Sequence, residues 1–243
     1  MRKLVGTALL VIFASGCASY TTPGAGVNVG DLSAADEDIA EIMSREAASP
    51  FPARISLARL QAAGYYSASN SCDGKGRYCI VTTRDIETDA DFAELESLPM
   101  VAGLAPLNRI LVPERLESIR ELRVAAAKLK TDILLVYSFD TRFNVESTDI
   151  GPLQLVALGF FRNKKAHVTT TASAALFDVR TGFVYGVAES SAVAQQKASV
   201  WSSEEAIDKA RLKTETDSFQ GLLDEVRTLW TNILETHVAT TGG

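Results

Sequence analysis

Apolar and polar positions along the chain predict helices and strands in turn. A helix is expected over residues 34 to 47, capped by Ser33, with Ile39, Ile42 and Met43 on one face. The alternation over residues 55 to 60 predicts a strand, and further strands are expected over 78 to 86 and 104 to 112. A short helix over 89 to 98 separates the last two. This order favours an α/β fold.

The clearest helical pattern follows Pro113, where apolar residues return every three or four positions. They are Leu116, Ile119, Leu122, Ala126 and Leu129. Residues 133 to 137 follow and are apolar without interruption, so this strand has no polar face. Such a strand is expected in the centre of a sheet.

Residues 167 to 179 and 183 to 189 predict a hairpin around the turn Arg180-Thr181-Gly182. Both faces of its first strand carry small or apolar residues, so helices are expected on both sides of the sheet. Ser202 and Glu205 form a capping box that opens a long C-terminal helical region. Its apolar stripe is expected in the core and comprises Phe219, Leu222, Leu223, Val226, Leu229, Trp230, Ile233 and Leu234. Residues 31 to 243 are thus predicted to form a single α/β domain with a mixed β-sheet covered by helices.

The first sixteen residues are typical of a bacterial lipoprotein signal peptide. Met1-Arg2-Lys3 is basic, residues 4 to 13 are apolar, and Ala14-Ser15-Gly16 is a small-residue cleavage site before Cys17. The apolar run is shorter than the roughly 20 residues that cross a bilayer. We therefore expect residues 1 to 16 to be removed and Cys17 to be lipidated. An ordinary signal peptide with an incidental cysteine is the alternative.

Residues 17 to 30 are small, polar and glycine-rich, which predicts a flexible tether between the lipid and the folded body. Residue 18 is alanine and not aspartate, the pattern of lipoproteins sorted to the outer membrane. The expected location is the periplasmic face of the outer membrane of a Gram-negative bacterium. The lipid bilayer is then one expected partner, and the protein is anchored in it through the acylated Cys17.

Composition adds limits to this picture. The chain is 47% hydrophobic and 22% charged, with a formal net charge of −6. Loss of Arg2 and Lys3 with the signal peptide makes the mature chain still more acidic. This net negative charge disfavours nucleic acid and anionic membrane surfaces as primary partners.

Cys72 and Cys79 remain as a pair once Cys17 is lipidated. The residues between them contain Asp-Gly and Gly-Arg turns, and the periplasm is oxidising, so a structural disulfide is expected. Free thiols are the alternative. The spacing differs from the two-residue gap of a redox pair, and no histidine lies nearby to complete a metal site.

Motifs that carry catalysis are missing from the sequence. His167 and His237 are the only histidines, and neither has metal-ligand spacing. No nucleophile elbow, phosphate-binding glycine loop or Ser-x-x-Lys pair is present. We therefore expect no enzyme activity, no cofactor and no metal, although carboxylates that meet only in the folded chain leave a hydrolase open.

Two segments carry a resemblance to known families: residues 131 to 138, TDILLVYS, and residues 175 to 185, ALFDVRTGFVY. Their order resembles the periplasmic fold shared by the TolB amino-terminal domain, the curli-secretion channel lipoprotein and the lipoproteins that activate peptidoglycan synthases. The same segments are loosely similar to rhombotarget lipoproteins. The resemblance implies an α/β fold and a role in the cell envelope, whereas Asp178 and Arg180 are expected to be polar residues of the hairpin end.

The segment from 144 to 165 interrupts two strands of the sheet and is rich in large apolar residues. They are Leu153, Leu155, Val156, Leu158, Phe160 and Phe161. In the curli channel family an insertion at the equivalent place spans the membrane, but Pro152 and the lack of a second insertion disfavour a pore here. The segment is expected either to pack over the core or to contact a partner or the lipid surface.

The sequence thus predicts a non-catalytic outer-membrane lipoprotein that acts by protein contacts in envelope assembly or regulation. Its protein partner is not identified by the sequence, and homo-oligomers remain open. A subunit of an oligomeric envelope export complex is the alternative, and an unrecognised periplasmic hydrolase is the second.

Overall fold

The computed structural model describes residues 39 to 67, 72, 76 to 145, 165 to 197 and 204 to 238. The elements in chain order are α2 (Ile39–Met43), β1 (Ala53–Ala62), β2 (Tyr78–Val81), α3 (Asp89–Glu96), β3 (Val101–Pro106), the 3-10 helix η1 (Arg109–Leu111), α4 (Ile119–Lys128), β4 (Ile133–Val145), β5 (Lys165–Asp178), β6 (Val184–Lys197) and α5 (Glu204–His237). None of the described helices combines the length and the apolar character needed to cross a membrane.

The strands form one mixed sheet of six strands in the order β2-β1-β4-β5-β6, with β3 also paired to β1. β1 runs parallel to β3 and β4, whereas the pairs β1–β2, β4–β5 and β5–β6 are antiparallel. β4 is interior, as its continuous apolar sequence predicts. The predicted fold class, an α/β domain with a mixed sheet and a long C-terminal helix, is confirmed.

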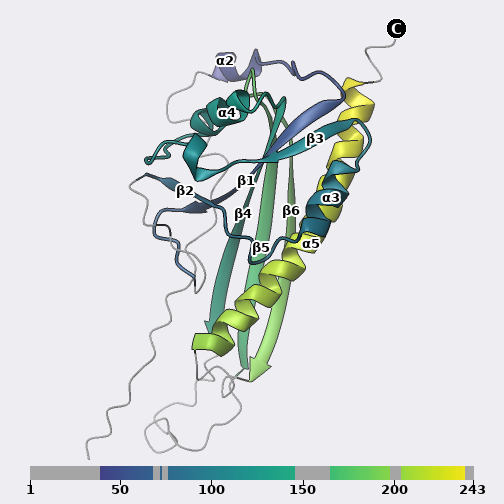
Figure 1. Ribbon diagram of the computed structural model, residues 1–243. Helices are drawn as coiled ribbons and strands as arrows, with labels where there is room; N and C mark the ends of the chain where they lie inside the picture. The colour runs from purple at the N-terminus through teal and green to yellow at the C-terminus, as the bar shows by residue number, and fades with distance from the viewer. Residues whose placement is uncertain (1–38, 68–71, 73–75, 146–164, 198–203, 239–243) are drawn as a thin grey trace, which may run out of the picture.

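Helices lie on both faces of the sheet (Figure 1). α3 and α5 cover one face, where the predicted stripe of α5 packs on β4 and β5 in one buried apolar cluster. α4 covers the other face, where Leu122 joins Val136 and Phe177 in a second cluster. α4 and α5 therefore bury the apolar stripes that their sequences predict.

β4, β5 and β6 form a long antiparallel ribbon of 13, 14 and 14 residues. The β4–β5 register runs from Ile133 opposite Asp178 to Val145 opposite Ala166. α4 packs only on the half of the ribbon near Asp178, as the members of its cluster show. The expected cover on both faces therefore holds for that half alone.

Some predicted boundaries are wrong. The first helix ends at Met43 and not at 47, because the backbone N–H of Ala48 donates to Asp178 Oδ2 and Ser49 Oγ donates to the same oxygen. None of the residues of α2 is buried, so Ile39, Ile42 and Met43 form no core face. The expected Ser33 cap lies outside the described residues.

Three other elements begin or end elsewhere. α4 starts at Ile119 and not at Pro113, because the carboxylate of Glu121 accepts the N–H groups of Glu117 and Ser118 and fixes the helix start. β2 stops at Val81. β3 ends at Pro106, and η1 follows where the predicted strand was to continue.

Candidate functional site

Of the residues that the sequence singles out, only some are described. Cys17 and the apolar residues Leu153, Leu155, Val156, Leu158, Phe160 and Phe161 lie outside the described residues. His167 lies on β5, and His237 packs against Phe183 and Tyr185 at the other end of the ribbon. The structure therefore does not bring the two histidines together. Within the described ranges, no group of three or more His, Cys, Asp or Glu side chains is placed to hold a metal ion.

The sheet face beneath α5 carries buried charges that the sequence analysis missed. Arg59 of β1 is 2% exposed and Arg211 of α5 is 0% exposed. Carboxylates from α5 and from the segment between β2 and α3 surround both. We call this set the ionic network: Arg59, Asp85, Glu87, Asp208, Arg211 and Glu215.

Arg59 links the sheet to the segment before α3. Its Nη1 donates to Asp85 Oδ1 at 2.7 Å and lies 3.5 Å from Glu87 Oε1, and its Nη2 donates to the Tyr65 hydroxyl at 3.2 Å. The guanidinium also lies over the Phe139 ring, 4.9 Å from its centroid, in a cation–π contact. One buried arginine thus joins three separate stretches of chain.

Arg211 makes the equivalent links from α5. Its Nη1 donates to Glu215 Oε2 at 2.6 Å, its Nε to Asp208 Oδ1 at 2.8 Å, and its Nη2 lies 3.5 Å from Asp85 Oδ2. Glu215 Oε2 is also 3.7 Å from Arg59, and its Oε1 accepts from Thr141 Oγ1 at 2.8 Å. Asp85 and Glu215 therefore bridge the two arginines.

The electrostatics fix the charge state of both arginines. Burial opposes the charge of Arg59, but Glu87, Asp85 and Glu215 outweigh it, so the arginine's pKa is raised. The pKa of Arg211 is raised in the same way, mainly by Glu215 against the effect of burial. Burial raises the pKa of Glu215 although both arginines oppose this shift. Because these side chains are engaged with one another and shielded from solvent, the network is suited to hold α5 on the sheet rather than to bind substrate.

A sequence signal for the network did exist. The α5 stripe, continued backward from Phe219 in steps of four, lands on Glu215 and Arg211, both fully buried. Arg59 likewise shares a strand face with Ile55 and Leu57. Charged residues at positions of a predicted apolar face indicate buried ion pairs, and this indication was overlooked.

The disulfide lies beside the ionic network. Cys72 and Cys79 are bonded, with their Cα atoms 5.8 Å apart. The N–H of Cys72 donates to the carbonyl of Tyr65, whose side chain is 1% exposed and packs with Val81 and both cysteines. The disulfide therefore holds Tyr65 in place, and the Tyr65 hydroxyl accepts from Arg59.

Replacing Cys72 and Cys79 by serine should lower the free energy of unfolding by about 2 kcal/mol, because a loop of this length regains chain entropy when it is not crosslinked. Urea denaturation of the pair variant, in a Cys17→Ser background, measures the loss. The parent under reducing conditions should match the variant. Equal midpoints for variant and oxidised parent would contradict the prediction.

Asp178 forms a second buried polar centre at the turn of the hairpin. Its Oδ1 accepts from the backbone N–H groups of Arg180 and Thr181, and its Oδ2 accepts from Ala48, Ser49 and the Tyr185 hydroxyl. Gly182, with φ of 76°, completes the tight turn that the sequence predicts. Asp178 is thus a structural residue of the hairpin end, as expected, and it also fastens the segment after α2.

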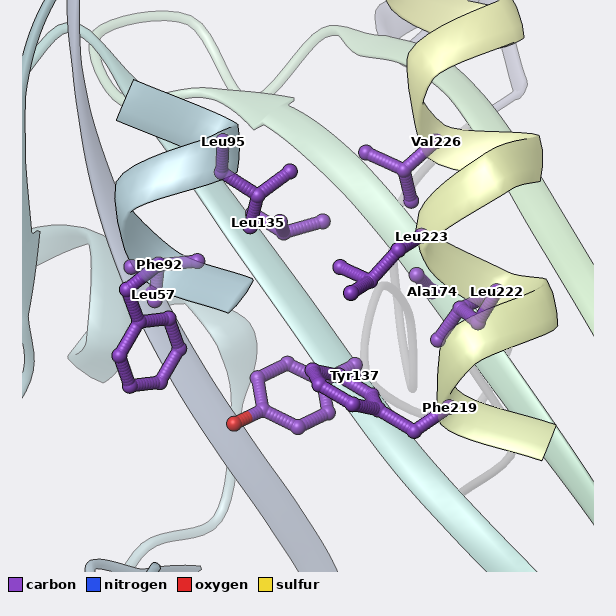
Figure 2. A pocket seen from close by; sticks show the side chains of 10 residues that line it. All are labelled: Leu57, Phe92, Leu95, Leu135, Tyr137, Ala174, Phe219, Leu222, Leu223 and Val226. Atoms are coloured by element: carbon purple, nitrogen blue, oxygen red, sulfur yellow. The ribbon is translucent and has the colours of Figure 1, made fainter. Parts of the chain in front are cut away.

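One cavity lies between the sheet, α3 and α5 (Figure 2). Its volume is about 10 Å³, the lower limit for one water molecule, and apolar side chains line it. The Tyr137 hydroxyl donates to Glu87 and offers no ligand contact there. The cavity is therefore a small packing gap and not a ligand site.

The far half of the ribbon, together with the neighbouring part of the edge strand β6, carries the more accessible surface. On the face that α4 covers elsewhere, no described element covers the residues near the ends of β4 and β6. We call this the open face: Asp140, Arg142, Thr169, Thr171, Ser173, Val187, Glu189, Ser191, Val193 and Gln195. Val187 is 65% and Val193 59% exposed. Hydrogen bonds run across it from Arg142 to Asp140 and between Thr171 and Ser191.

No family model matches the chain, and no curated protein matches it. Among solved structures, a hypothetical protein from Chlamydia trachomatis is similar over 72% of this chain and 95% of its own length. The two share 11% sequence identity, with a TM-score of 0.29. A likeness at this level carries no argument about function.

Proposed function

We propose that the protein is a non-catalytic lipoprotein, anchored to the outer membrane through Cys17, which binds an envelope protein by its open face. The observation that carries the proposal is this face itself. Three adjacent strands present hydroxyl groups, opposite charges and two exposed valines without a covering helix among the described elements. Such a face can form both hydrogen bonds and apolar contacts with a partner.

The position of the open face supports the same proposal. The chain leaves β4 at Val145 and returns at Lys165, at the end of the ribbon where the open face lies. The segment between these residues holds the apolar side chains from Leu153 to Phe161. Both points at which the sheet connects to this segment therefore lie at the end of the ribbon that carries the open face.

Photo-crosslinking in cells tests this function. A crosslinking residue at Val193 or Ser191 of the lipidated protein should give a discrete adduct with another envelope protein. The control position is Lys213 on α5, whose side chain is 64% exposed on the other side of the sheet. Failure to find a protein adduct on the open face, or equal adducts at position 213, would refute the proposal.

The anchor has its own test. Cys17→Ser should leave the fold intact and abolish the crosslink, because the body no longer stays at the membrane. A soluble Cys17→Ser form that gives the full adduct would show that anchorage is unnecessary. Far-UV circular dichroism of both forms checks that the fold is unchanged.

The edge strand β6 favours a second candidate function, in which the protein is a subunit of an oligomeric envelope complex. β6 is 14 residues long, and no described strand pairs with its outer side. A long unpaired edge is suited to pairing with another chain. Native mass spectrometry of the detergent-extracted protein decides, since a monomer would reject this candidate.

A further inference from the structure

The outward surface of α4 and of the segment before it is basic, although the chain as a whole is acidic. Residues 109 to 130 contain six basic side chains and three acidic ones. The apolar side of α4 faces the sheet, so the charged side faces outward. We call the exposed basic set the α4 face: Arg109, Arg115, Arg120, Lys128 and Lys130.

The three carboxylates of this region, Glu114, Glu117 and Glu121, are too few to neutralise its six basic side chains. Glu121 is engaged with the backbone N–H groups at the helix start, and Glu117 lies 3.6 Å from Arg115. The other four basic side chains form no ion pair with any residue that the structure describes. Their charge is therefore available to a partner.

The acidic residues are concentrated on the other side of the sheet. α3 and α5 together contain twelve acidic and four basic residues. They are separated from α4 by two packing distances of about 10 Å each. Because the screening length at physiological salt is about 8 Å, a surface in contact with α4 experiences mainly its basic residues.

Apolar side chains lie within the same surface. Ile110 of η1 is 88% exposed and Val124 of α4 is 44% exposed. Val124 lies between Arg120 and Lys128 at four-residue steps along the helix, so the three share one side. Exposed apolar residues among lysines and arginines are typical of surfaces that bind anionic lipid headgroups.

Lys130 provides a separate indication. It follows α4 with φ of 58°, the left-handed conformation that glycine adopts at lowest cost after a helix. The chain instead has a lysine here, exposed to solvent. The residue thus adds a positive charge to the α4 face at a position where a glycine would adopt the backbone conformation at lower cost.

The position of α2 agrees with a bilayer as the occupant. α2, which begins at Ile39, lies at the same end of the molecule as α4 (Figure 1). Twenty-one residues lie between Ile39 and Cys17. A chain of that length spans at most about 75 Å, which limits how far the α4 face can lie from the acyl chains.

We propose that the α4 face docks on a phospholipid bilayer through anionic headgroups. The proposal rests on the proposed anchor at Cys17 for its placement near a membrane. It also refines the expectation from net charge: the acidic chain as a whole avoids anionic surfaces, but this face is locally positive. Lipidation brings the body to the membrane, and the α4 face then orients it.

Vesicle sedimentation tests the docking without an acyl chain. The mature chain, residues 17 to 243 with Cys17→Ser, is mixed with vesicles of phosphatidylethanolamine containing phosphatidylglycerol, or with phosphatidylcholine alone. Binding to the anionic vesicles is expected, with loss at high salt. Each lysine or arginine near the surface raises partition about fivefold, so Arg120→Gln with Lys128→Gln should weaken it about 25-fold.

The matched control removes the same charge elsewhere. Lys209→Gln with Lys213→Gln, both exposed on α5 across the sheet from α4, should change partition less than about twofold. Equal loss in the control, or equal binding to both vesicle types, would overturn the proposal. Absence of binding to either type of vesicle would also overturn the proposal. The α4 face would then be expected to bind an acidic protein instead. Because the assay involves neither lipidation nor the open face, its failure is distinct from failure of the proposed function.

Discussion

Replacing Arg211 by methionine should destabilise the protein by about 3 to 5 kcal/mol, the usual cost of breaking a buried ion pair by removing one partner. Methionine retains much of the aliphatic length but not the charge. Glu215, whose side chain is 0% exposed, would then lose its donor at 2.6 Å with no access to solvent. Asp208, 18% exposed, would lose its donor at 2.8 Å. Urea denaturation followed by circular dichroism measures the change.

The same helix contains a matched control. Lys213 and Asp217 form an ion pair with the same spacing as Arg211 and Glu215, but their side chains are 64% and 50% exposed. Lys213→Met should therefore cost about 0.5 kcal/mol or less. If the two substitutions had equal effects, the ionic network would not be the attachment of α5 that the structure indicates.

Asp178→Asn should lower the free energy of unfolding by about 2 kcal/mol at neutral pH, because an amide cannot accept all the hydrogen bonds that the carboxylate accepts. One amide oxygen can still accept from Arg180 and Thr181. The amide nitrogen would then face the N–H of Ala48, which is left without an acceptor. Denaturation of both proteins in urea at pH 7 gives the difference.

The pH dependence of this variant has a definite sign. Burial alone would raise the pKa of Asp178, but hydrogen bonds from Thr181, Ser49, Ala48 and Tyr185 outweigh it and lower the pKa below its ordinary value of 3.8. A carboxyl with a lowered pKa contributes stability above its unfolded pKa and loses it as the pH falls further. The curves of parent and variant should therefore converge below about pH 3.8. An exposed control, Asp224→Asn, should stay within about 0.5 kcal/mol of the parent at neutral pH. If the difference in unfolding free energy between Asp178→Asn and the parent did not change with pH, the lowered pKa of Asp178 would be contradicted.

Local patterns predicted the elements that depend on burial. The continuous apolar run at 133 to 137 is the interior strand β4, and the stripe from Phe219 to Leu234 packs in the core. The hairpin turn at Gly182 is also where the sequence places it. In each case, one short stretch of sequence contains the whole pattern that predicts the element.

Contacts between distant residues could not be predicted in this way. α2 stops early because Ala48 and Ser49 bind Asp178, which lies some 130 residues further along the chain. Asp85 and Glu87 meet Arg59 and Arg211 only when the segment before α3 folds against α5. No local pattern contains such partners, so the ionic network was missed although its residues stand on predicted apolar faces.

The sheet also determines how the protein would bear load. The segment after α2 is fastened to Asp178 at one end of β5, while the apolar segment 144 to 165 leaves from the other end. Tension between an anchored N-terminus and a partner at that far end would act along the strands. The N-terminal segment continues into β1, which is parallel to β4, so the β1–β4 hydrogen bonds from Ile55 opposite Ile133 to Arg59 opposite Tyr137 would then be sheared together. The body should therefore resist mechanical pulling far better than its thermodynamic stability suggests.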